Sequence, residues 1–365
     1  MSKNIVFFVH SLNSGGVENY LLRFLREKHT EFSNVFVYCK SGWSGQLEAE
    51  YSKIENVKVI KEKIDYLDVK VLYSLNIFLK KNKISSVCDF TGNFSGLTLL
   101  TARMAGMNKR IAFYRSSRNR FKSSIFRNSY NSILNHLVKK NATDILANSE
   151  AGLNHFFPNI WKYDSKFEVI YNGINASEFI NSKNNLRYEF GIPDSAFVIG
   201  HTGRFNSAKN HTAILAVAEK IVKEYDDIYF IMCGNGVKNN LGLDLKSKNL
   251  ASKILVFENR SDIPEFLNTM DCYFFPSITE GQPNALIEAM IMGLPYVASN
   301  IESIKEITIN SDGLYSPDDI DSFIKDLIFI YKNRPDKDIS LQKKYINKFD
   351  HHVNFDKFCS RIFKI

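Results

Sequence analysis

The amino-acid sequence predicts an α/β protein with two domains, each built on a parallel β-sheet covered by helices. At 365 residues the chain exceeds the size at which a single hydrophobic core stops growing. Short apolar runs alternate with longer segments of helical periodicity along most of its length. This rhythm is typical of parallel sheets with helices on both faces. It stops in a polar segment over residues 172–194 and then starts again, which indicates two similar domains joined by a linker.

Seven strands are expected before the linker, because apolar residues gather there in short runs. These runs are Ile5–Val9, Val35–Cys39, Val57–Ile60, Ser86–Phe90, Arg110–Tyr114, Asp144–Ala147 and Phe167–Tyr171. Between them, apolar residues recur at helical spacing in four segments, Val17–Lys28, Val69–Lys80, Leu97–Ala105 and Ser124–Lys139.

The same alternation is expected after the linker. The elements in order are strand Ala196–His201, helix Thr212–Glu224, strands Ile228–Cys233 and Ile254–Phe257, helix Ile263–Met270, strand Cys272–Pro276, helix Ala285–Met292 and strand Tyr296–Ser299. We therefore place the domains at residues 1–175 and 176–349, with the last helical segment, 350–365, a candidate to pack back on the first domain. Ligands of open α/β sheets bind outside the carboxyl ends of the strands, so both domains are expected to face one cleft.

Composition excludes several classes of protein. Hydrophobic residues make up 44% and charged residues 24%, as in ordinary globular proteins. No apolar run approaches the roughly 20 residues that span a bilayer, and the N-terminal apolar run is too short for a signal peptide. The five cysteines lie far apart, which favours neither a disulfide framework nor a zinc site. A cytoplasmic protein with reduced thiols is expected.

The net charge of +8 is concentrated in one interval of the chain. Between Asp89 and Asp144 there are ten basic residues and no acidic one, whereas the rest of the chain has 37 basic and 39 acidic residues. A local excess of this kind predicts an anionic partner. No nucleic-acid-binding motif is present, and aromatic residues interleave with the cations, so we expect an anionic membrane surface rather than a nucleic acid. A solvated basic face is the alternative.

The strongest candidate site is the segment from Pro276 to Glu288, which follows a predicted buried strand. A helix is expected to begin near Asn284, a good N-cap residue. The backbone N–H groups of Ala285 and Leu286 would then be able to hold a phosphate.

Two glutamates of this segment can accept hydrogen bonds from the hydroxyl groups of a ribose or a hexose. Glu280 lies in the loop before the helix and Glu288 in its second turn. In the alternative interpretation, Glu288 only favours the positive end of the helix and Glu280 is a solvated loop residue.

Two further loops follow predicted strands. Arg204 and Lys209 lie five residues apart in the first of them, where two cations can bind a diphosphate and stabilise a departing nucleotide. Gly15 and Gly16 lie in the second, where paired glycines let the backbone approach a ligand. Surface charges in one loop and a plain tight turn in the other are the alternatives.

Four motifs occur together in a fixed order: Gly15-Gly16-Val17-Glu18, Val169-Ile170-Tyr171-Asn172-Gly173-Ile174, Gly203-Arg204-Phe205 with Lys209-Asn210-His211, and Pro276-Ser277 with Glu280, Asn284, Glu288, Gly293 and Pro295. In this combination the sequence resembles the family 4 glycosyltransferases. These enzymes have the GT-B fold of two Rossmann-like domains facing a central cleft, and they retain the anomeric configuration. The resemblance extends from Ile5 to about Ser316 and is most specific at the two glutamates separated by seven residues.

The resemblance implies a role for each matching position. Arg204 and Lys209 would bind the donor diphosphate and assist its departure, Glu280 would contact the transferred sugar, and Glu288 the ribose. It implies a nucleotide-sugar donor, expected to be a UDP-sugar, held by Gly15, Gly16, Arg204, Lys209, Asn259, Asn284, Ala285, Leu286 and Glu288. The catalytic set would be Glu280, Arg204 and Lys209. No cofactor and no metal are implied, and Asp319-Ile320-Asp321, which resembles the metal motif of another glycosyltransferase fold, is expected to cap a helix.

The acceptor is expected to bind the first domain. Many relatives carry a histidine after the strand equivalent to Arg110–Tyr114, whereas this chain has Arg115 and Ser116 there. Either residue replaces the histidine, or the sugar needs no partner at that point. The expected acceptor site is Arg115, Ser116, Arg118 and Arg120.

The expected acceptor is a glycan or a lipid-diphosphate-linked glycan, bound at the cytoplasmic face of the membrane in a capsule or O-antigen pathway. With one carboxylate candidate facing the sugar, Glu280, a same-face transfer is favoured over a double displacement. A nucleotide-sugar epimerase, a phosphorylase and a non-catalytic nucleotide-sugar-binding protein are the rival classes.

Overall fold

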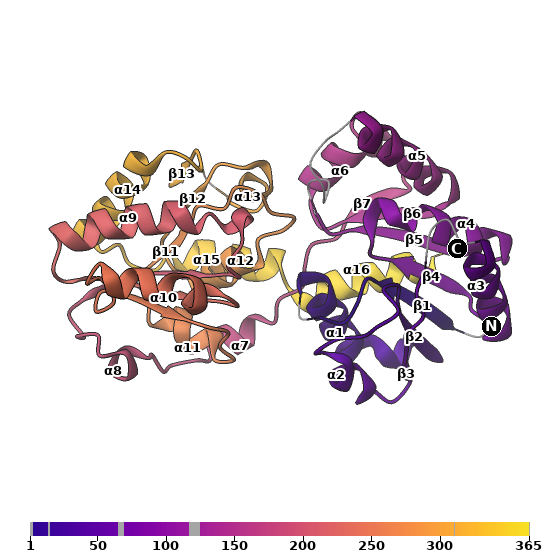
Figure 1. Ribbon diagram of the computed structural model, residues 1–365, viewed down its shortest axis with the longest axis horizontal. Helices are drawn as coiled ribbons and strands as arrows, with labels where there is room; N and C mark the ends of the chain where they lie inside the picture. The colour runs from indigo at the N-terminus through magenta and orange to yellow at the C-terminus, as the bar shows by residue number, and fades with distance from the viewer. Residues whose placement is uncertain (1–2, 14, 65–68, 117–124, 310, 365) are drawn as a thin grey trace. The chain divides into compact units, whose positions relative to one another are not determined.

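A computed structural model describes residues 3–13, 15–64, 69–116, 125–309 and 311–364 of the chain (Figure 1). The chain divides into two compact units. Unit 1 consists of Met1–Gly173 together with His351–Ile365, and unit 2 consists of Ile174–Asp350. The prediction of two parallel-sheet α/β domains is confirmed.

In the described part of unit 1, seven parallel strands form one sheet in the order β3-β2-β1-β4-β5-β6-β7. All six residues of β1 are buried, because strands at the centre of a parallel sheet are covered on both faces. The strands are β1 (Asn4–Val9), β2 (Asn34–Cys39), β3 (Val57–Ile60), β4 (Ser86–Asp89), β5 (Lys109–Tyr114), β6 (Asp144–Ala147) and β7 (Phe167–Val169).

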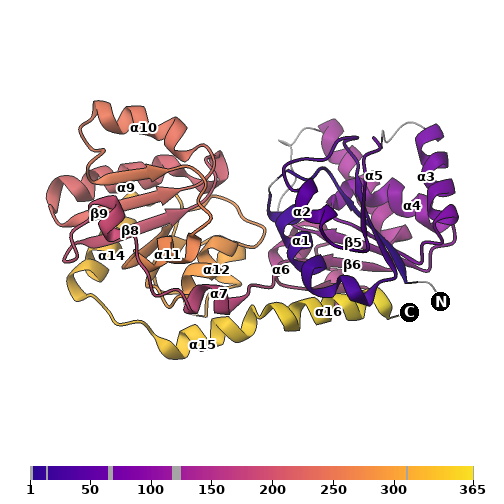
Figure 2. The same ribbon diagram turned by 90° about the horizontal axis from the view of Figure 1, so that it is seen from below.

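Two helical layers cover this sheet (Figure 2). Side chains of α1 (Gly16–Lys28) and α16 (His351–Phe363) pack on one face, in a core with Phe7, Phe90 and Phe113. On the other face lie α3 (Val69–Lys81), α4 (Gly96–Met104), α5 (Ile125–Asn141) and α6 (Glu150–Phe156). Shorter elements of this unit are η1 (His29–Glu31), α2 (Glu48–Ser52), η2 (Gly92–Ser95) and η3 (Trp161–Tyr163).

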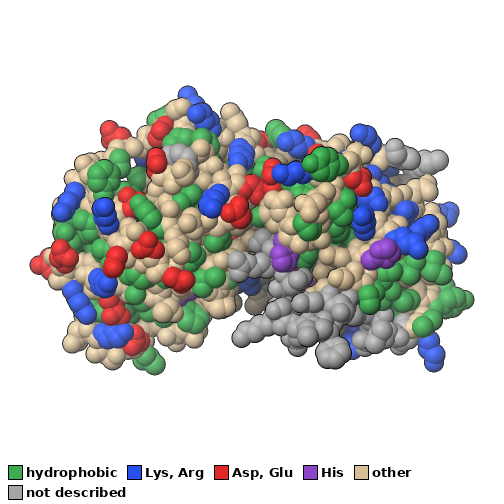
Figure 3. Space-filling view, turned by 90° about the horizontal axis from the view of Figure 1, so that it is seen from above, with side chains coloured by type: hydrophobic (Ala, Val, Ile, Leu, Met, Phe, Trp, Pro, Cys, Tyr) green, Lys and Arg blue, Asp and Glu red, His purple; other side chains and the backbone are tan. Residues whose placement is uncertain are grey.

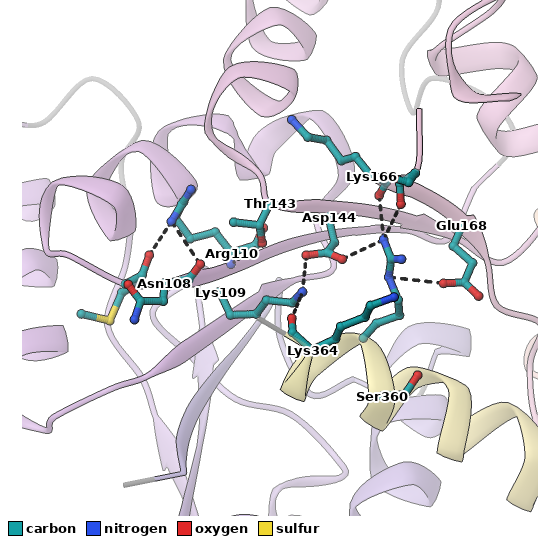
Figure 4. A network of polar contacts seen from close by, with 12 residues as sticks. Asn108, Lys109, Arg110, Thr143, Asp144, Lys166, Glu168, Ser360 and Lys364 are labelled. Atoms are coloured by element: carbon teal, nitrogen blue, oxygen red, sulfur yellow. Dashed lines mark hydrogen bonds and ion pairs between the residues drawn. The ribbon is translucent and has the colours of Figure 1, made fainter. Parts of the chain in front are cut away.

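The C-terminal helix α16 is fixed to the sheet of unit 1 by a polar network (Figure 4). Arg361 lies 2.8 Å from Asp144 and 3.3 Å from Glu168. Lys109 reaches the other oxygen of Asp144 at 2.7 Å and donates to the carbonyl of Lys364 at 2.6 Å. Since Phe355 and Phe358 of the same helix lie in the unit 1 core, α16 is an integral part of that core.

In the described part of unit 2, six parallel strands form a second sheet in the order β10-β9-β8-β11-β12-β13. The strands are β8 (Phe197–Thr202), β9 (Ile228–Cys233), β10 (Ile254–Phe257), β11 (Cys272–Phe275), β12 (Tyr296–Ser299) and β13 (Leu314–Tyr315). The helices are η4 (Ser207–Lys209), α9 (His211–Glu224), α10 (Val237–Ser247), α11 (Ile263–Asn268), α12 (Asn284–Ile291), α13 (Glu302–Lys305), α14 (Ile320–Asn333) and α15 (Ile339–Lys348).

The structure contains helices that the sequence prediction did not include. The segment predicted as a linker contains two short helices, α7 (Ala176–Ile180) and α8 (Arg187–Phe190). Helix α10 was not predicted, and its weak apolar pattern of three buried residues explains why. The predicted helix cap at Asp319 is confirmed, because α14 begins after Asp319 and its side chain accepts a hydrogen bond from the Ser322 amide at 3.0 Å.

All five cysteines are buried, and none of them forms a disulfide in the structure. Among the described residues, no helix is both long enough and apolar enough to cross a bilayer.

Candidate active site

The candidate donor site lies where the strand order of unit 2 reverses. Strands β8 and β11 are neighbours, and their connections leave in opposite directions, toward β9 and toward β12. In open α/β sheets, ligands bind at such a switch point, outside the carboxyl ends of the strands. Two loops begin there, residues 203–210 and 276–283, and they carry the predicted catalytic residues Arg204, Lys209 and Glu280.

These two loops are tied to each other by hydrogen bonds. The amide of Ile278 donates to the carbonyl of Ala208 at 2.8 Å. The Asn210 side chain donates to the carbonyls of Pro276 at 3.1 Å and Pro317 at 3.0 Å. Asn210 has a φ of 57°, in the left-handed region that asparagine tolerates better than most residues. The sequence prediction gave Asn210 no role, although it lay within the Lys209-Asn210-His211 motif.

Lys209 and Glu280, one from each loop, form an ion pair. The Lys209 Nζ lies 2.8 Å from Glu280 Oε1, and the two side chains are 16% and 13% exposed. The ammonium group also lies 4.5 Å from the ring centre of Phe275, and the Asn206 side chain accepts a hydrogen bond from the Lys209 amide. Because the pair is largely shielded from water, its charges interact more strongly than those of an exposed pair.

Helix α12 begins one residue earlier than a cap at Asn284 would require. Asn284 is already the first helical residue, and Pro283, at the N-cap position, makes no side-chain cap. The amide of Leu286 donates to the carbonyl of Pro283 at 3.1 Å, so it is already used within the first turn. The Ala285 amide makes no hydrogen bond to a described residue, which leaves it as the donor of the predicted pair. Glu288 is half-buried in the second turn.

Arg204 and Asn259 are exposed on their loops, and no described contact joins them to the Lys209–Glu280 pair. The loop of Asn259 is nevertheless well held. Its neighbour Arg260 lies 2.5 Å from Asp262, with the guanidinium 5.1 Å from the Phe190 ring. Glu258 accepts hydrogen bonds from the amides of Gly236 and Asn239 at the start of α10. The sequence prediction missed this role of Glu258.

Two neutral histidines lie beside Lys209. His201 is buried and its Nδ1 lies 3.0 Å from the carbonyl oxygen of Phe274, and burial holds its pKa well below the usual range. Burial, assisted by the nearby Lys209 ammonium, lowers the pKa of His211 to about 4. Both imidazoles are therefore uncharged near neutral pH, and they add no positive charge to the site.

In unit 1, Gly15 and Gly16 follow β1 at the corresponding switch point, between β1 and β4. Gly15 precedes the first residue of α1. A Cβ atom at Gly15 would lie 2.5 Å from an oxygen of Glu18, whereas one at Gly16 would meet nothing within 4 Å. Only the flexible end of the Glu18 side chain would have to shift for a Cβ at Gly15, so packing requires neither glycine, and Gly16 leaves open space at the start of α1.

Arg115 follows β5 and is held by aromatic rings. Its guanidinium carbon lies 3.7 Å from the ring centre of Tyr20 and 5.0 Å from that of Phe113. Burial lowers the pKa of Arg115 to about 10, and its Nη1 has no hydrogen-bond partner among the described residues. Ser116 is exposed. Arg118 and Arg120, also predicted to bind the acceptor, lie outside the described residues.

One group of side chains in the described residues has the spacing of metal ligands. Ligand atoms of Glu27, His351 and His352 lie within 4.8 Å of one another. Lys28, however, lies 3.1 Å from the same Glu27 carboxylate and 2.6 Å from Asp356 of α16. These contacts, together with those of Glu27 to His351 and His352, join α1 to α16.

Comparison with known proteins agrees with this architecture. Residues 182–348 match the family model described as glycosyl transferases group 1. The chain is 26% identical over 362 residues to the capsular polysaccharide biosynthesis glycosyltransferase CapH of Staphylococcus aureus, covering 97% of this chain and 93% of the relative. It is 27% identical over 318 residues to the UDP-Gal:alpha-D-GlcNAc-diphosphoundecaprenol alpha-1,3-galactosyltransferase of Escherichia coli, covering 83% and 79%.

The fold is similar to that of Anabaena Alr3699/HepE in its crystal structure with UDP, with a TM-score of 0.82, 16% identity, and coverage of 99% of this chain and 100% of that one. The chain is therefore a glycosyltransferase with the GT-B fold, and its residues 182–348 match the family model of the glycosyl transferases group 1.

Proposed function

We propose that the protein transfers a hexose from a UDP-sugar to a lipid-diphosphate-linked glycan, with retention of the anomeric configuration and without a metal ion. The observation that carries this proposal is the Lys209–Glu280 pair, held between two loops at the switch point of unit 2. It brings together a cation for a diphosphate and a carboxylate for sugar hydroxyls. The Escherichia coli relative is named for a UDP-sugar donor and a diphosphoundecaprenol acceptor, which supports the choice of substrates.

Each donor group has a proposed partner in unit 2. Arg204 and Lys209 neutralise the diphosphate, and the Ala285 amide donates to it from the first turn of α12. Glu288 accepts hydrogen bonds from the ribose, and Glu280 from the transferred sugar. The loop that carries Asn259 receives the base.

The transfer step follows from the same charges. The bond between the anomeric carbon and the phosphate oxygen breaks, and its electron pair stays on the departing UDP. Lys209 and Arg204 stabilise this developing charge, as preorganised cations do in other active sites. The acceptor oxygen bonds to the anomeric carbon on the same face, and its proton passes to the leaving phosphate oxygen. Glu280, held by Lys209 at 2.8 Å, orients the sugar rather than attacking it.

We assign the acceptor to unit 1, and propose that the protein acts at the cytoplasmic face of the membrane. Arg115 and Ser116, directly after β5, are the described residues of this proposed acceptor site. An arginine held by ring faces keeps its hydrogen-bonding edge for an anion, such as a phosphate of the acceptor.

The test is a panel of UDP-, GDP- and ADP-sugars, with nucleotide release measured with and without a diphospho-lipid glycan. We expect release from the UDP-sugar that depends on the acceptor, and a glycosidic product of unchanged anomeric configuration by NMR. Release of an altered free sugar without acceptor would indicate an epimerase, and binding without turnover a non-catalytic protein; either result would contradict the proposal.

The matched variants are Glu288→Ala and Glu302→Ala, since Glu302 is an exposed residue of α13 in the same unit. We expect Glu288→Ala to weaken UDP binding in calorimetry by at least about tenfold, because a hydrogen bond to a charged group contributes about 1.5–3 kcal/mol. Glu302→Ala should bind like the parent. Equal affinity of the two variants would remove Glu288 from the site.

A further inference from the structure

Three neighbouring helices of unit 1, α3, α4 and α5, carry outward charges of a single sign. From Val69 to Thr143, which spans α3, α4 and α5, the sequence contains fourteen basic residues and one acidic residue, Asp89. Asp89 is fully buried and lies 2.5 Å from Lys40, so it adds no negative charge to the surface. The exposed cations of these helices include Lys70, Lys80, Lys81, Arg103, Lys139 and Lys140.

Helix dipoles alone do not explain this distribution. Cations are favoured in the last turn of any helix, and α3, α4 and α5 all have them there. Acidic residues are equally favoured in the first turn, yet none occurs in these helices. On the opposite face of the same sheet, α1 and α16 carry Glu18, Glu27 and Asp356. The asymmetry therefore belongs to α3, α4 and α5, because α6 on the same face begins with the exposed Glu150.

Large apolar side chains are exposed among these cations. On α3, Val69, Tyr73 and Ile77 are 77%, 68% and 47% exposed. Because they recur every four residues they form one stripe, and the stripe continues at helical spacing onto Lys80 and Lys81. Each of the two neighbouring helices also has one exposed apolar side chain near an exposed cation. These are Met104 next to Arg103 on α4, and Ile133 seven residues before Lys140 on α5.

The three helices form one continuous layer. Contacts join α3 to α4 and α4 to α5, and Figure 2 shows them together, on the side of the sheet away from α16. On the face in Figure 3, basic side chains lie beside hydrophobic ones on unit 1 with few acidic ones, whereas both signs intersperse on unit 2. We call the exposed side chains of α3, α4 and α5 the basic helical face.

We propose that the basic helical face docks on the surface of an anionic lipid bilayer. Lysines attract anionic headgroups, while aliphatic side chains and a tyrosine between them enter the boundary with the acyl chains. A single-stranded nucleic acid would instead favour several aromatic rings and arginines for base stacking, and the apolar exposed side chains here are mostly aliphatic. The proposal relocates membrane contact from the segment around Arg115 to this helical layer, and it extends the proposed function by supplying a partner.

The experiment is co-sedimentation of the full chain with vesicles of phosphatidylglycerol and phosphatidylcholine, and with phosphatidylcholine alone. We expect binding to the anionic vesicles at low salt, weaker binding at high salt, and none to the neutral vesicles. The variant Lys80→Gln/Lys81→Gln/Lys139→Gln should lower the partition coefficient about 100-fold at low salt, at roughly fivefold for each cation lost. The control Lys223→Gln/Lys246→Gln/Lys332→Gln removes three exposed lysines of unit 2 and should bind like the parent.

The apolar stripe has its own matched pair. Tyr73→Ser/Ile77→Ser should weaken vesicle binding at both salt concentrations, whereas Leu243→Ser/Phe329→Ser, at two exposed apolar positions of unit 2, should not. The proposal would be overturned if both lysine variants lost vesicle binding equally, or if neutral vesicles bound the protein as well as anionic ones. It would also be overturned if single-stranded RNA displaced the protein from the vesicles.

Acceptor-dependent UDP release with a detergent-solubilised acceptor separates this proposal from the proposed function. If the variant Lys80→Gln/Lys81→Gln/Lys139→Gln loses vesicle binding but releases UDP at an unchanged rate, the result supports the docking surface and leaves the proposed transferase activity intact. Release without any vesicle binding by the parent refutes the surface alone, and vesicle binding without release refutes the transferase alone.

Discussion

Two lysine–carboxylate pairs occupy comparable places in the two sheets, but they differ in their access to water. In unit 1, Lys40 follows β2 and Asp89 ends β4; their side chains are 2% and 0% exposed. Lys40 also donates to the Thr91 hydroxyl and to the Phe94 carbonyl. In unit 2, Lys209 and Glu280 are 2.8 Å apart and each keeps part of its surface in solvent.

The difference supports a structural role for the first pair and the proposed catalytic role for the second. The Lys40–Asp89 pair is sealed, and its hydrogen-bonding groups are used within the protein, so it has nothing to offer a ligand. It fixes the ends of two strands that flank β1. The Lys209–Glu280 pair is shielded enough from water for its two charges to interact strongly. It is also exposed enough for either side chain to form hydrogen bonds to a ligand instead. Sequence alone does not separate the two, because each is a lysine and an acid after predicted strands.

The largest effect on stability is expected from breaking the sealed pair. Asp89→Ala leaves the Lys40 ammonium buried without its carboxylate, and we expect unit 1 to lose about 3–5 kcal/mol of unfolding free energy. Both tryptophans, Trp43 and Trp161, lie in unit 1, so urea denaturation followed by tryptophan fluorescence reports on this unit. The control is Lys53→Ala in the exposed pair with Glu50, also in unit 1, which should cost less than about 0.5 kcal/mol. A similar small loss for both would show that burial is not what distinguishes them.

The open pair should matter for catalysis more than for folding. Lys209→Met removes the proposed partner of the leaving diphosphate, and we expect sugar transfer to fall about 100- to 1,000-fold, as when a preorganised charge donor is removed. The unfolding transition should move little, since Glu280 can turn to water. Initial rates and circular dichroism melting curves measure the two effects. If Lys209→Met unfolded as readily as Asp89→Ala but transferred sugar normally once folded, the Lys209–Glu280 pair would have a structural role and not a catalytic one.

A smaller effect is expected from acid in unit 2. The pKa of His211 is lowered to about 4 in the folded state, against about 6.5 when unfolded. The unfolded chain thus binds the extra proton first, so the stability contributed by the neutral imidazole is complete above about pH 6.5 and is lost as pH falls toward 4. By pH 5 we expect the free energy of unfolding to fall by about 1–2 kcal/mol. The loss is limited to this range because His211 retains some contact with solvent.

Hydrogen exchange of the α9 amides at pH 7 and pH 5 measures this loss. His211→Gln should show a smaller change than the parent between the two pH values. An equal change in both would assign the acid sensitivity to another group.

Much of the fold followed from the spacing of apolar residues. Strands Val57–Ile60, Asp144–Ala147, Ile254–Phe257 and Tyr296–Ser299 have the predicted bounds, because each is a short apolar run between polar residues. Helix α10 was missed because only Val237, Leu241 and Leu245 of its eleven residues are buried, too few for a clear period. The start of α12 was placed one residue late because Asn284 is a good cap in general, whereas here Pro283 precedes it with no side chain that can accept.

The site was predicted in part for the same reasons. Glu280, Lys209 and the helix start came from residue types in loops after buried strands. Their pairing depends on how two loops 70 residues apart approach each other, through the Ala208–Ile278 and Asn210–Pro276 hydrogen bonds. Sequence spacing carries no information on that distance. Assignment to family 4, retention of configuration and independence of metal stay predictions.

The return of α16 to unit 1 has a consequence for biosynthesis. Unit 2 is a continuous stretch, Ile174–Asp350, whereas unit 1 is completed by residues made after it. Domains of a growing chain generally fold as units, the N-terminal one first. Here the first unit leaves the ribosome with Tyr20, Phe24 and Phe113 lacking the cover of Phe355 and Phe358. The second unit can therefore reach its native state before the first, and a chain that stalls before α16 would expose the aromatic core of unit 1 to chaperones and proteases.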